Sequence, residues 1–364
     1  MKCCCLKGKA NEQTNSAKEK FTPLRDMSAR KSSSPEFEMR LLHRLEGHGG
    51  AVRYCTVDPG GKILATCSTD GKINLWSIAT GENIRTLKDG HSAEVTACSF
   101  CSFGSILASS SRDKKVILWN YQTGKRASRL ELHSDAVLFC AFSKDGKFLA
   151  SASRDKTARL YKIRSEVGEF VPGADVKQLS GHTAAVNVVK FSLDGAIALT
   201  GSDDRTIRAW RKENDWACVC TLTDFYGPVK RIIFSPVKDP VFVTLAGYRA
   251  TLWTMHGNNF TPNCSVDVRG SDKQIKDITF IPDGRYVVGV AVDGTVNIWD
   301  SAVEEKGACT TWKCLSHNLS QAGMKEGGRA NKHEGAIEQT CCIFARRHFI
   351  SADSSGLTHI WEIV

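Results

Sequence analysis

The chain has 364 residues, of which 24% are charged and 41% are hydrophobic, and its formal net charge is +10 at pH 7. No apolar stretch approaches the roughly 20 residues of a membrane-spanning helix, and residues 1–30 lack the apolar segment of a secretory signal. The 15 cysteines are an odd number in such a chain, which favours reduced thiols in the cytosol or nucleus. We expect a cytoplasmic protein that is not secreted, with a nuclear or a membrane-associated location as alternatives.

The N-terminal segment, residues 1–38, has a different composition from the rest. It is rich in Lys, Ser, Asn and Glu and has few large apolar residues, so we expect a disordered basic arm. Cys3, Cys4 and Cys5 are adjacent and flanked by lysines, and acyl chains together with basic charge attach proteins stably to membranes. Lys2 stands where myristoylation needs a Gly, so a tolerated cysteine cluster without lipid is the alternative.

Beyond this arm, one spacing returns four times. A His is followed 22 residues later by an Asp and 6 residues after that by an aromatic residue, with a Ser two residues before the Asp. A fixed period of about 43 residues indicates a repeat architecture. The four copies are His48, Ser68, Asp70 and Trp76; His91, Ser111, Asp113 and Trp119; His133, Ser153, Asp155 and Tyr161; and His182, Ser202, Asp204 and Trp210.

Short β-favouring runs separate these marks. In the first copy they include residues 51–57, 63–66 and 83–87, with a third run that ends at Trp76, and turns rich in Gly and Asp lie between them. Such runs are typical of strands in an antiparallel meander. Four strands per repeat of this length predict one blade of a β-propeller.

The repeats resemble those of the WD40 family over residues 40–364. Leu45–His48 and Leu179–His182 resemble the family's Gly-His opening, and Ile298–Asp300 resembles its Trp-Asp close. The resemblance implies an all-β, seven-bladed WD40 β-propeller over residues 39–364. Three blades that depart from the pattern are identified by their aromatic ends at Trp253, Trp299 and Trp361.

Ring closure is also predicted from the sequence. Residues 39–45 form a strand-like run before the first Gly-His, with no blade of their own. The last blade lacks a fourth strand after Trp361. We therefore expect residues 39–45 to supply that strand, which would remove the exposed sheet edges of an open ring.

We interpret the repeated polar residues as structural. The Asp carboxylate can accept the imidazole N–H, while the Ser and the Trp N–H complete a buried network. A hydrolytic Ser-His-Asp triad is a poor explanation, because four equivalent sites in one ring are scaffolding. Cys98 and Cys101 have the spacing of zinc ligands, but no second pair matches them, so we interpret them as core cysteines. We expect no metal, no cofactor and no catalytic residue.

The resemblance implies a non-catalytic scaffold or adaptor that binds partner proteins or peptides on the top face of the ring. Cations outnumber carboxylates among the expected contact positions, which favours an acidic or phosphorylated peptide because Arg pairs bidentately with both groups. Leu138 is the expected apolar anchor, and solvated surface charge is the alternative explanation. The candidate residues are Arg53, Glu94, Arg112, Leu138, Arg154, Asp203, Lys230, Lys276 and Glu338.

An insertion interrupts the period near the end of the chain. The spacing from Trp299 to Trp361 is 62 residues, well above the period. With an outer strand ending at Leu315, the excess is residues 316–331, a loop that we expect on the top face, where it could fold over a ligand.

The alternative function is a membrane-associated propeller held by its acylated arm, or a lipid- or nucleic-acid-binding propeller that acts through its +10 charge. The basic residues are spread over the blades rather than clustered with stacking aromatics, which argues against nucleic acid. Motifs of hydrolases, metalloproteases and phosphate-binding loops are missing from the sequence. We expect neither an enzyme nor a small-molecule substrate.

Overall fold

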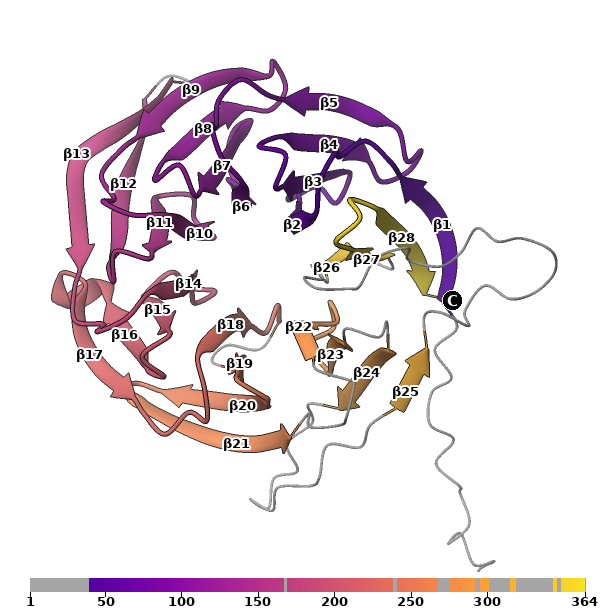
Figure 1. Ribbon diagram of the computed structural model, residues 1–364. Coiled ribbons are helices and arrows are strands. Elements are labelled where there is room, and N and C mark those ends of the chain that lie inside the picture. Colours follow the sequence, from indigo (N-terminus) through magenta and orange to yellow (C-terminus); the bar gives the residue numbers. More distant parts are fainter. Residues whose placement is uncertain are drawn as a thin grey trace, which may run out of the picture. The chain divides into compact units, whose positions relative to one another are not determined.

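The computed structural model of the chain describes residues 39–166, 169–237, 241–267, 275–291, 295–300, 315–318, 343–345 and 348–363. These residues form seven four-stranded antiparallel sheets, which stand as blades around a ring (Figure 1). The expected all-β, seven-bladed propeller is thereby confirmed. The expected disordered arm at residues 1–38, with Cys3, Cys4 and Cys5, lies outside the described residues, as does Glu338.

The first four blades are meanders of four consecutive strands, with the first strand innermost and the last outermost (Figure 1). Blade one comprises β2 (Val52–Val57), β3 (Ile63–Ser68), β4 (Ile73–Ser77) and β5 (Asn83–Leu87). Blade two comprises β6 (Val95–Phe100), β7 (Ile106–Ser111), β8 (Val116–Asn120) and β9 (Lys125–Leu130). Blade three comprises β10 (Val137–Phe142), β11 (Phe148–Ser153), β12 (Ala158–Glu166) and β13 (Glu169–Leu179). Blade four comprises β14 (Val186–Phe191), β15 (Ile197–Ser202), β16 (Ile207–Arg211) and β17 (Ala217–Leu222), with the short 3₁₀ helix η1 (Lys212–Asn214) before its last strand.

The last three blades keep the same order. Blade five comprises β18 (Val229–Phe234), β19 (Val241–Ala246), β20 (Arg249–His256) and β21 (Asn259–Asp267). Blade six comprises β22 (Ile275–Phe280), β23 (Tyr286–Ala291), β24 (Thr295–Asp300) and β25 (Leu315–Asn318). Blade seven comprises β26 (Ile343–Ala345), β27 (His348–Ala352), β28 (Thr358–Ile363) and, as its outer strand, β1 (Met39–Leu45).

The outer strand of blade six corrects one expectation about the insertion. Residues 316–318 belong to β25, where Ser316 pairs with Asn297 of β24, so a loop that begins at Ser316 is wrong. The hairpin register extends the strand three residues beyond Leu315. The remaining part of the expected loop, residues 319–331, lies outside the described residues.

Closure of the ring by β1 is confirmed. This strand pairs antiparallel with β28 and places Leu41 opposite Trp361. Leu45, at the end of β1, is 1% exposed and packs in one cluster with Leu64 of blade one and Ile360 of blade seven. A strand from the start of the described chain therefore joins the first and last blades and covers the sheet edge of β28.

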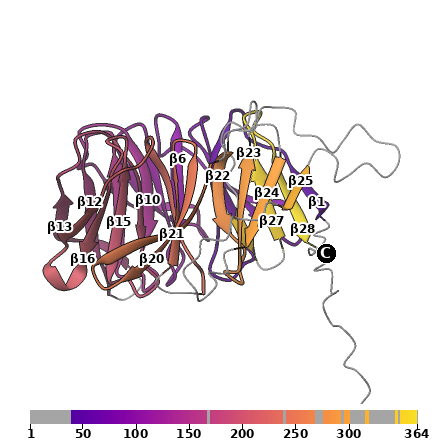
Figure 2. The same ribbon diagram turned by 90° about the horizontal axis from the view of Figure 1, so that it is seen from below.

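Small cores between adjoining blades hold the ring together. Blades one and two share a cluster that includes Leu75 and Phe100, and blades two and three share one that includes Leu118 and Leu149. Burial of each such side chain contributes about 1.5–3 kcal/mol. Seen from the side, the strands run between two faces of the ring (Figure 2). The top face carries the loops that enter each first strand and the turns between second and third strands.

Candidate functional site

A buried hydrogen-bond network recurs in the first four blades. In blade one, His48 Nδ1 lies 3.1 Å from Asp70 Oδ2, and His48 Nε2 lies 2.8 Å from Thr66 Oγ1. Trp76 Nε1 donates to the same hydroxyl at 2.8 Å. Because an ionised carboxylate only accepts hydrogen bonds, Nδ1 carries the imidazole proton and Nε2 accepts from Thr66. The other three networks are His91, Asp113, Ser109 and Trp119; His133, Asp155, Ser151 and Tyr161; and His182, Asp204, Thr200 and Trp210.

The hydroxyl in this network is not the one expected from the sequence. Leu64 pairs with Trp76, so Thr66 lies diagonally across from the indole, whereas Ser68 lies about 6.8 Å further along the strand. Ser68 stabilises the turn instead: it accepts the Asp70 N–H at 3.2 Å and donates to the Gly50 carbonyl at 2.9 Å. The same correction applies to the other predicted serines, which accept the N–H of the Asp two residues later: Ser111, Ser153 and Ser202.

Burial sets the charge state of these networks. It lowers the pKa of His48, His133 and His182 below the ordinary value of 6.5, although the neighbouring carboxylates oppose the shift. Burial raises the pKa of Asp204, but hydrogen bonds from Thr206, a backbone N–H and His182 outweigh it and lower the value to about 2. At neutral pH the imidazoles of His48, His133 and His182 are therefore neutral and donate to ionised carboxylates, which suits a structural clamp rather than a proton-transfer site.

Seven of the nine predicted binding residues come together around one cup at the centre of the top face. This central cup has a volume of about 260 Å³ and is formed by the first strands and the turns of blades one to five. Lys276 holds the matching position in β22 and is half-buried, but it does not line the cup. The cup is lined by Arg53, Tyr54, Glu94, Thr96, Arg112, Leu138, Phe139, Arg154, Ala185, Asn187, Asp203, Lys230 and Arg231.

Ion pairs between neighbouring blades organise the wall of the cup. The carboxylate of Glu94 is shared by Arg53 of blade one and Arg112 of its own blade, the latter at 2.8 Å. In the next sector Asp203 accepts from Lys230 of blade five at 2.6 Å. Asp203 also accepts from the Asn187 side chain at 2.7 Å. These contacts fix the directions of the long side chains before any ligand arrives, which reduces the entropy that binding would cost.

The charge in the cup is unbalanced. Five of its lining residues are cations and two, Glu94 and Asp203, are carboxylates. Arg231 pairs at 2.7 Å with Asp277 of blade six, which is 3% exposed. Arg154 is exposed, and no acidic group of the described chain lies within ion-pair distance of it. A surplus of guanidinium groups in a concave site favours an anionic ligand.

Two aromatic rings close the floor of the cup and were missed by the sequence analysis. Tyr54 and Phe139 meet edge to face with their ring centroids 5.2 Å apart, although they come from blades one and three. Lys190 of blade four lies over the Phe139 ring at 4.9 Å and donates to the Tyr54 hydroxyl at 3.3 Å. Tyr54 and Phe139 therefore form an aromatic floor for the central cup.

A β-bulge explains why these residues were missed. Strict alternation predicts that the residue after Arg53 points away from the cup. The register of β2 with β3 shifts between Val52 and Tyr54, so that both Arg53 and Tyr54 reach the cup. The same shift occurs before Phe139 in β10 and before Arg231 in β18. The bulge falls at the same position in the first strands of several blades, so it does not change the spacing of the His, Asp and aromatic residues and could not be predicted from it.

The described residues offer a binding surface. Within them no group of three or more His, Cys, Asp or Glu side chains is placed to hold a metal ion. Cys98 and Cys101 are 1% and 5% exposed, in keeping with their interpretation as core cysteines. The same residues contain no helix of the length and apolar character needed to cross a membrane.

Comparison with known proteins agrees with this geometry. The family model described as WD domain, G-beta repeat matches residues 39–77, 81–120, 124–162, 173–211 and 262–300, together more than half of the chain. The stretch between the last two matches contains most of blade five.

Three similar proteins match short stretches of the chain. The ribosome biogenesis protein ERB1 of Yarrowia lipolytica is 37% identical over 59 residues, 16% of this chain and 7% of that protein. ERB1 of Candida albicans is 39% identical over 59 residues, again 16% and 7%. The ribosome biogenesis protein BOP1 homolog of Caenorhabditis elegans is 42% identical over 53 residues, 14% and 8%. The match thus spans less than a tenth of the length of each relative.

Proposed function

Because this chain belongs to the WD domain, G-beta repeat family, we propose that it is a non-catalytic scaffold that binds an acidic or phosphorylated segment of a partner protein in the central cup. The surplus of cations among the residues that line the cup supports this proposal most directly. Carboxylate and phosphate oxygens match the paired N–H donors of a guanidinium.

The arrangement of the cup suggests how such a segment is held. Arg154 offers a guanidinium without an ion pair in the described chain, and Arg112 is 45% exposed beside the shared Glu94. An incoming anion can contact these two without displacing a buried pair. Leu138 and the aromatic floor then provide apolar contacts for the side chains that flank the anion.

Fluorescence polarisation with a labelled oligoglutamate peptide and a labelled phosphoserine peptide tests the proposal. We expect Arg154→Gln to weaken binding by roughly fivefold to thirtyfold, about 1–2 kcal/mol for one charged hydrogen bond. Arg126→Gln, which removes an exposed Arg of the outer strand β9, is the matched control and should change nothing. The proposal would be contradicted if Arg154→Gln bound the acidic peptides as tightly as the wild type does and the wild type bound an oligoglutamine peptide equally well.

Location is a second part of the proposal. The names of the three relatives refer to ribosome biogenesis, which favours a nuclear pool beside the cytoplasmic one. Quantitative fractionation of the full chain checks this, and a chain confined to the cytoplasm would contradict it. Membrane association through Cys3, Cys4 and Cys5 stays the alternative, and an acyl-exchange assay against the triple Ser variant distinguishes it.

A further inference from the structure

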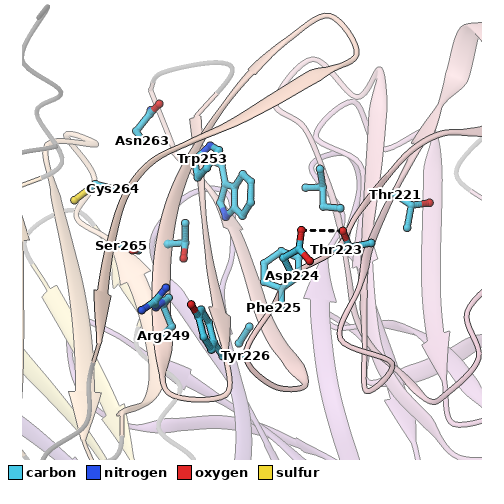
Figure 3. A pocket seen from close by; sticks show the side chains of 14 residues that line it. Thr221, Thr223, Asp224, Phe225, Tyr226, Arg249, Trp253, Asn263, Cys264 and Ser265 are labelled. Carbon is cyan, nitrogen blue, oxygen red and sulfur yellow. Dashed lines mark hydrogen bonds between the residues drawn. The ribbon is translucent and has the colours of Figure 1, made fainter. Parts of the chain in front are cut away.

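Blade five contains a second cavity, of about 610 Å³, separate from the central cup (Figure 3). Its wall is formed by the end of β17, the connection to β18 and the strands β20 and β21. No residue is shared between the two linings. The blade-five pocket and the cup are therefore two sites with separate linings.

The pocket lies where blade five departs from the Gly-His step. In blades one and two the Gly before the His lies close to the indole: an ideal Cβ would be 3.0 Å from the Trp76 ring on Gly47 and 2.3 Å from the Trp119 ring on Gly90. In blade five Asp224 stands at the position of this Gly, with a left-handed φ of 68°. Asp224 and Phe225 of this connection line the pocket together with Trp253.

Phe225 stands at the position of the missing His. Its ring packs on Trp253 with a centroid separation of 5.6 Å. The facing turn contains Gly247 where the other networks have an Asp, and the Gly227 Cα lies 3.2 Å from an ideal Cβ on Gly247. The aromatic pair and the close backbone approach stand in place of the His–Asp pair, while Trp253 Nε1 still donates to Thr244 Oγ1 at 3.0 Å.

One face of β20 supplies the chemistry of the pocket. Arg249, Thr251 and Trp253 alternate along the strand and all line the cavity. Thr251 is 6% exposed, and its hydroxyl makes no hydrogen bond to any residue that the structure describes. The Arg249 guanidinium stacks on the Tyr226 ring at 4.1 Å, and Tyr226 itself is 65% exposed. Figure 3 shows Arg249 and Tyr226 together at one end and Trp253 at the other.

We propose that the blade-five pocket binds a linear peptide of a partner protein, which inserts an aromatic side chain beside Phe225 and Trp253 and places an adjacent carboxylate on Arg249. The volume lies in the usual range of ligand sites, about 300–1,000 Å³. Aromatic side chains in apolar pockets are typical anchors of such interfaces. Stacking on Tyr226 orients the Arg249 guanidinium, whose edge donors match a carboxylate.

Polar groups of the wall suit a peptide backbone. The Thr251 hydroxyl, which has no hydrogen-bond partner among the described residues, can donate to a peptide carbonyl, and the Asp224 carboxylate can accept a peptide N–H. Asp224 is exposed and already accepts from Thr223 at 3.2 Å, which fixes its orientation. The strand β21 is the outer strand of its sheet, so an extended segment can approach along it.

The experiment follows the indole N–H resonance of Trp253 in the ¹⁵N-labelled full chain. The probe is acetyl-Gly-Ser-Trp-Glu-Ser-Gly-amide, and the comparison peptides carry Ala in place of Trp or Gln in place of Glu. We expect a saturable shift of Trp253, loss of binding with the Ala peptide, and about tenfold weaker binding with the Gln peptide.

Variants of the protein test the assignment of residues. Thr251→Phe fills the cavity and should abolish the shift, and Arg249→Gln should weaken binding about as much as the Gln peptide does. Lys115→Gln, at the matching position of the complete blade two, is the control for charge, and Arg154→Gln is the control for the cup. Both controls should give the same Trp253 shift at each probe concentration as the wild type, whether or not the cup also binds acidic peptides.

Three results would overturn this proposal. The first is a Trp253 resonance that does not move in a saturable way with the probe. The second is equal binding of the Trp and Ala peptides. The third is a Trp253 shift that follows protein concentration alone, because a second copy of the chain would then occupy the pocket.

Discussion

At the scale of single residues, one buried hydroxyl in each complete polar network connects the imidazole to the aromatic side chain. Thr200 joins the imidazole of His182 to the indole of Trp210 at 2.8 Å and 2.9 Å, and it is fully buried. The carboxylate of Asp204 holds the other side of the imidazole and also accepts the Thr183 N–H at 3.0 Å. The network thus joins the loop that enters the blade, its second strand and its third strand.

Thr200→Val should destabilise the ring without changing its shape. The substitution removes the hydroxyl and leaves the imidazole nitrogen and the indole N–H of this network buried without partners. Each such group costs about 1–3 kcal/mol, and the free energy of unfolding in urea should fall accordingly. Thr221→Val, at an exposed Thr of the same blade, is the control. Equal urea midpoints for the two variants would refute the role of the network.

The buried imidazoles predict a pH dependence. The pKa values of His48, His133 and His182 in the folded chain are lowered by burial, so the unfolded state binds protons first as the pH falls. Their contribution to stability is complete above the unfolded value of about 6.5 and is lost as the pH falls below it. The melting temperature should therefore decrease between roughly pH 7.5 and 5.5.

Blade five suggests the control for this pH effect. Phe and Gly stand there in place of His and Asp, so His182→Phe combined with Asp204→Gly removes one titrating pair in a way the chain already uses. The double variant should lose less stability on acidification than the wild type does. A wild-type melting temperature that is constant or rises over this range would contradict the assignment of neutral imidazoles.

At the scale of strands, the ring depends on β1. This strand closes blade seven, and its Leu45 packs against both the first and the last blade. Leu45→Ala leaves a cavity at the junction and should lower the free energy of unfolding by about 2–5 kcal/mol.

Leu132→Ala is the matched control, because Leu132 is 45% exposed. That variant should stay within about 0.5 kcal/mol of the wild type in urea unfolding. If both variants unfold at the same urea concentration, β1 does not hold the ring closed.

The strands also show what could be predicted from the sequence. The spacing of His48, Asp70 and Trp76 was sufficient to predict the blades, because it repeats a local unit whose strands pair with their sequence neighbours. The closure by β1 could be predicted because residues 39–45 are a strand-like run that has no blade of its own. Seven of the nine predicted binding residues line one cup because they hold equivalent positions in successive blades.

Other features could not be predicted, since they depend on register rather than on spacing. The bulge that brings Tyr54 into the cup leaves no mark in the period, and the hairpin register decides that Thr66 rather than Ser68 reaches the indole. The blade-five pocket had a signal, the loss of Gly-His at Asp224, but only packing shows that a cavity results.

At the scale of the whole ring, stability and binding are assigned to different residues. The networks and inter-blade cores hold the blades, while the cup collects one or more charged side chains from each of five blades. Because side chains from five blades line the cup, its geometry depends on the arrangement of those blades in the ring. The charge surplus at its centre is the feature on which the proposed scaffold function rests.

The most direct test of that function is a quantitative pull-down with three forms of the full chain. One form carries Arg112→Gln, Arg154→Gln and Lys230→Gln in the cup, and the matched form carries Lys88→Gln, Lys125→Gln and Arg126→Gln at exposed positions elsewhere. Both triple variants lose the same charge, so non-specific attraction is balanced between them. We expect partners with acidic or phosphorylated segments to be retained by the wild type and the matched form and lost from the folded cup variant. Identical partner sets for all three forms would contradict binding in the cup.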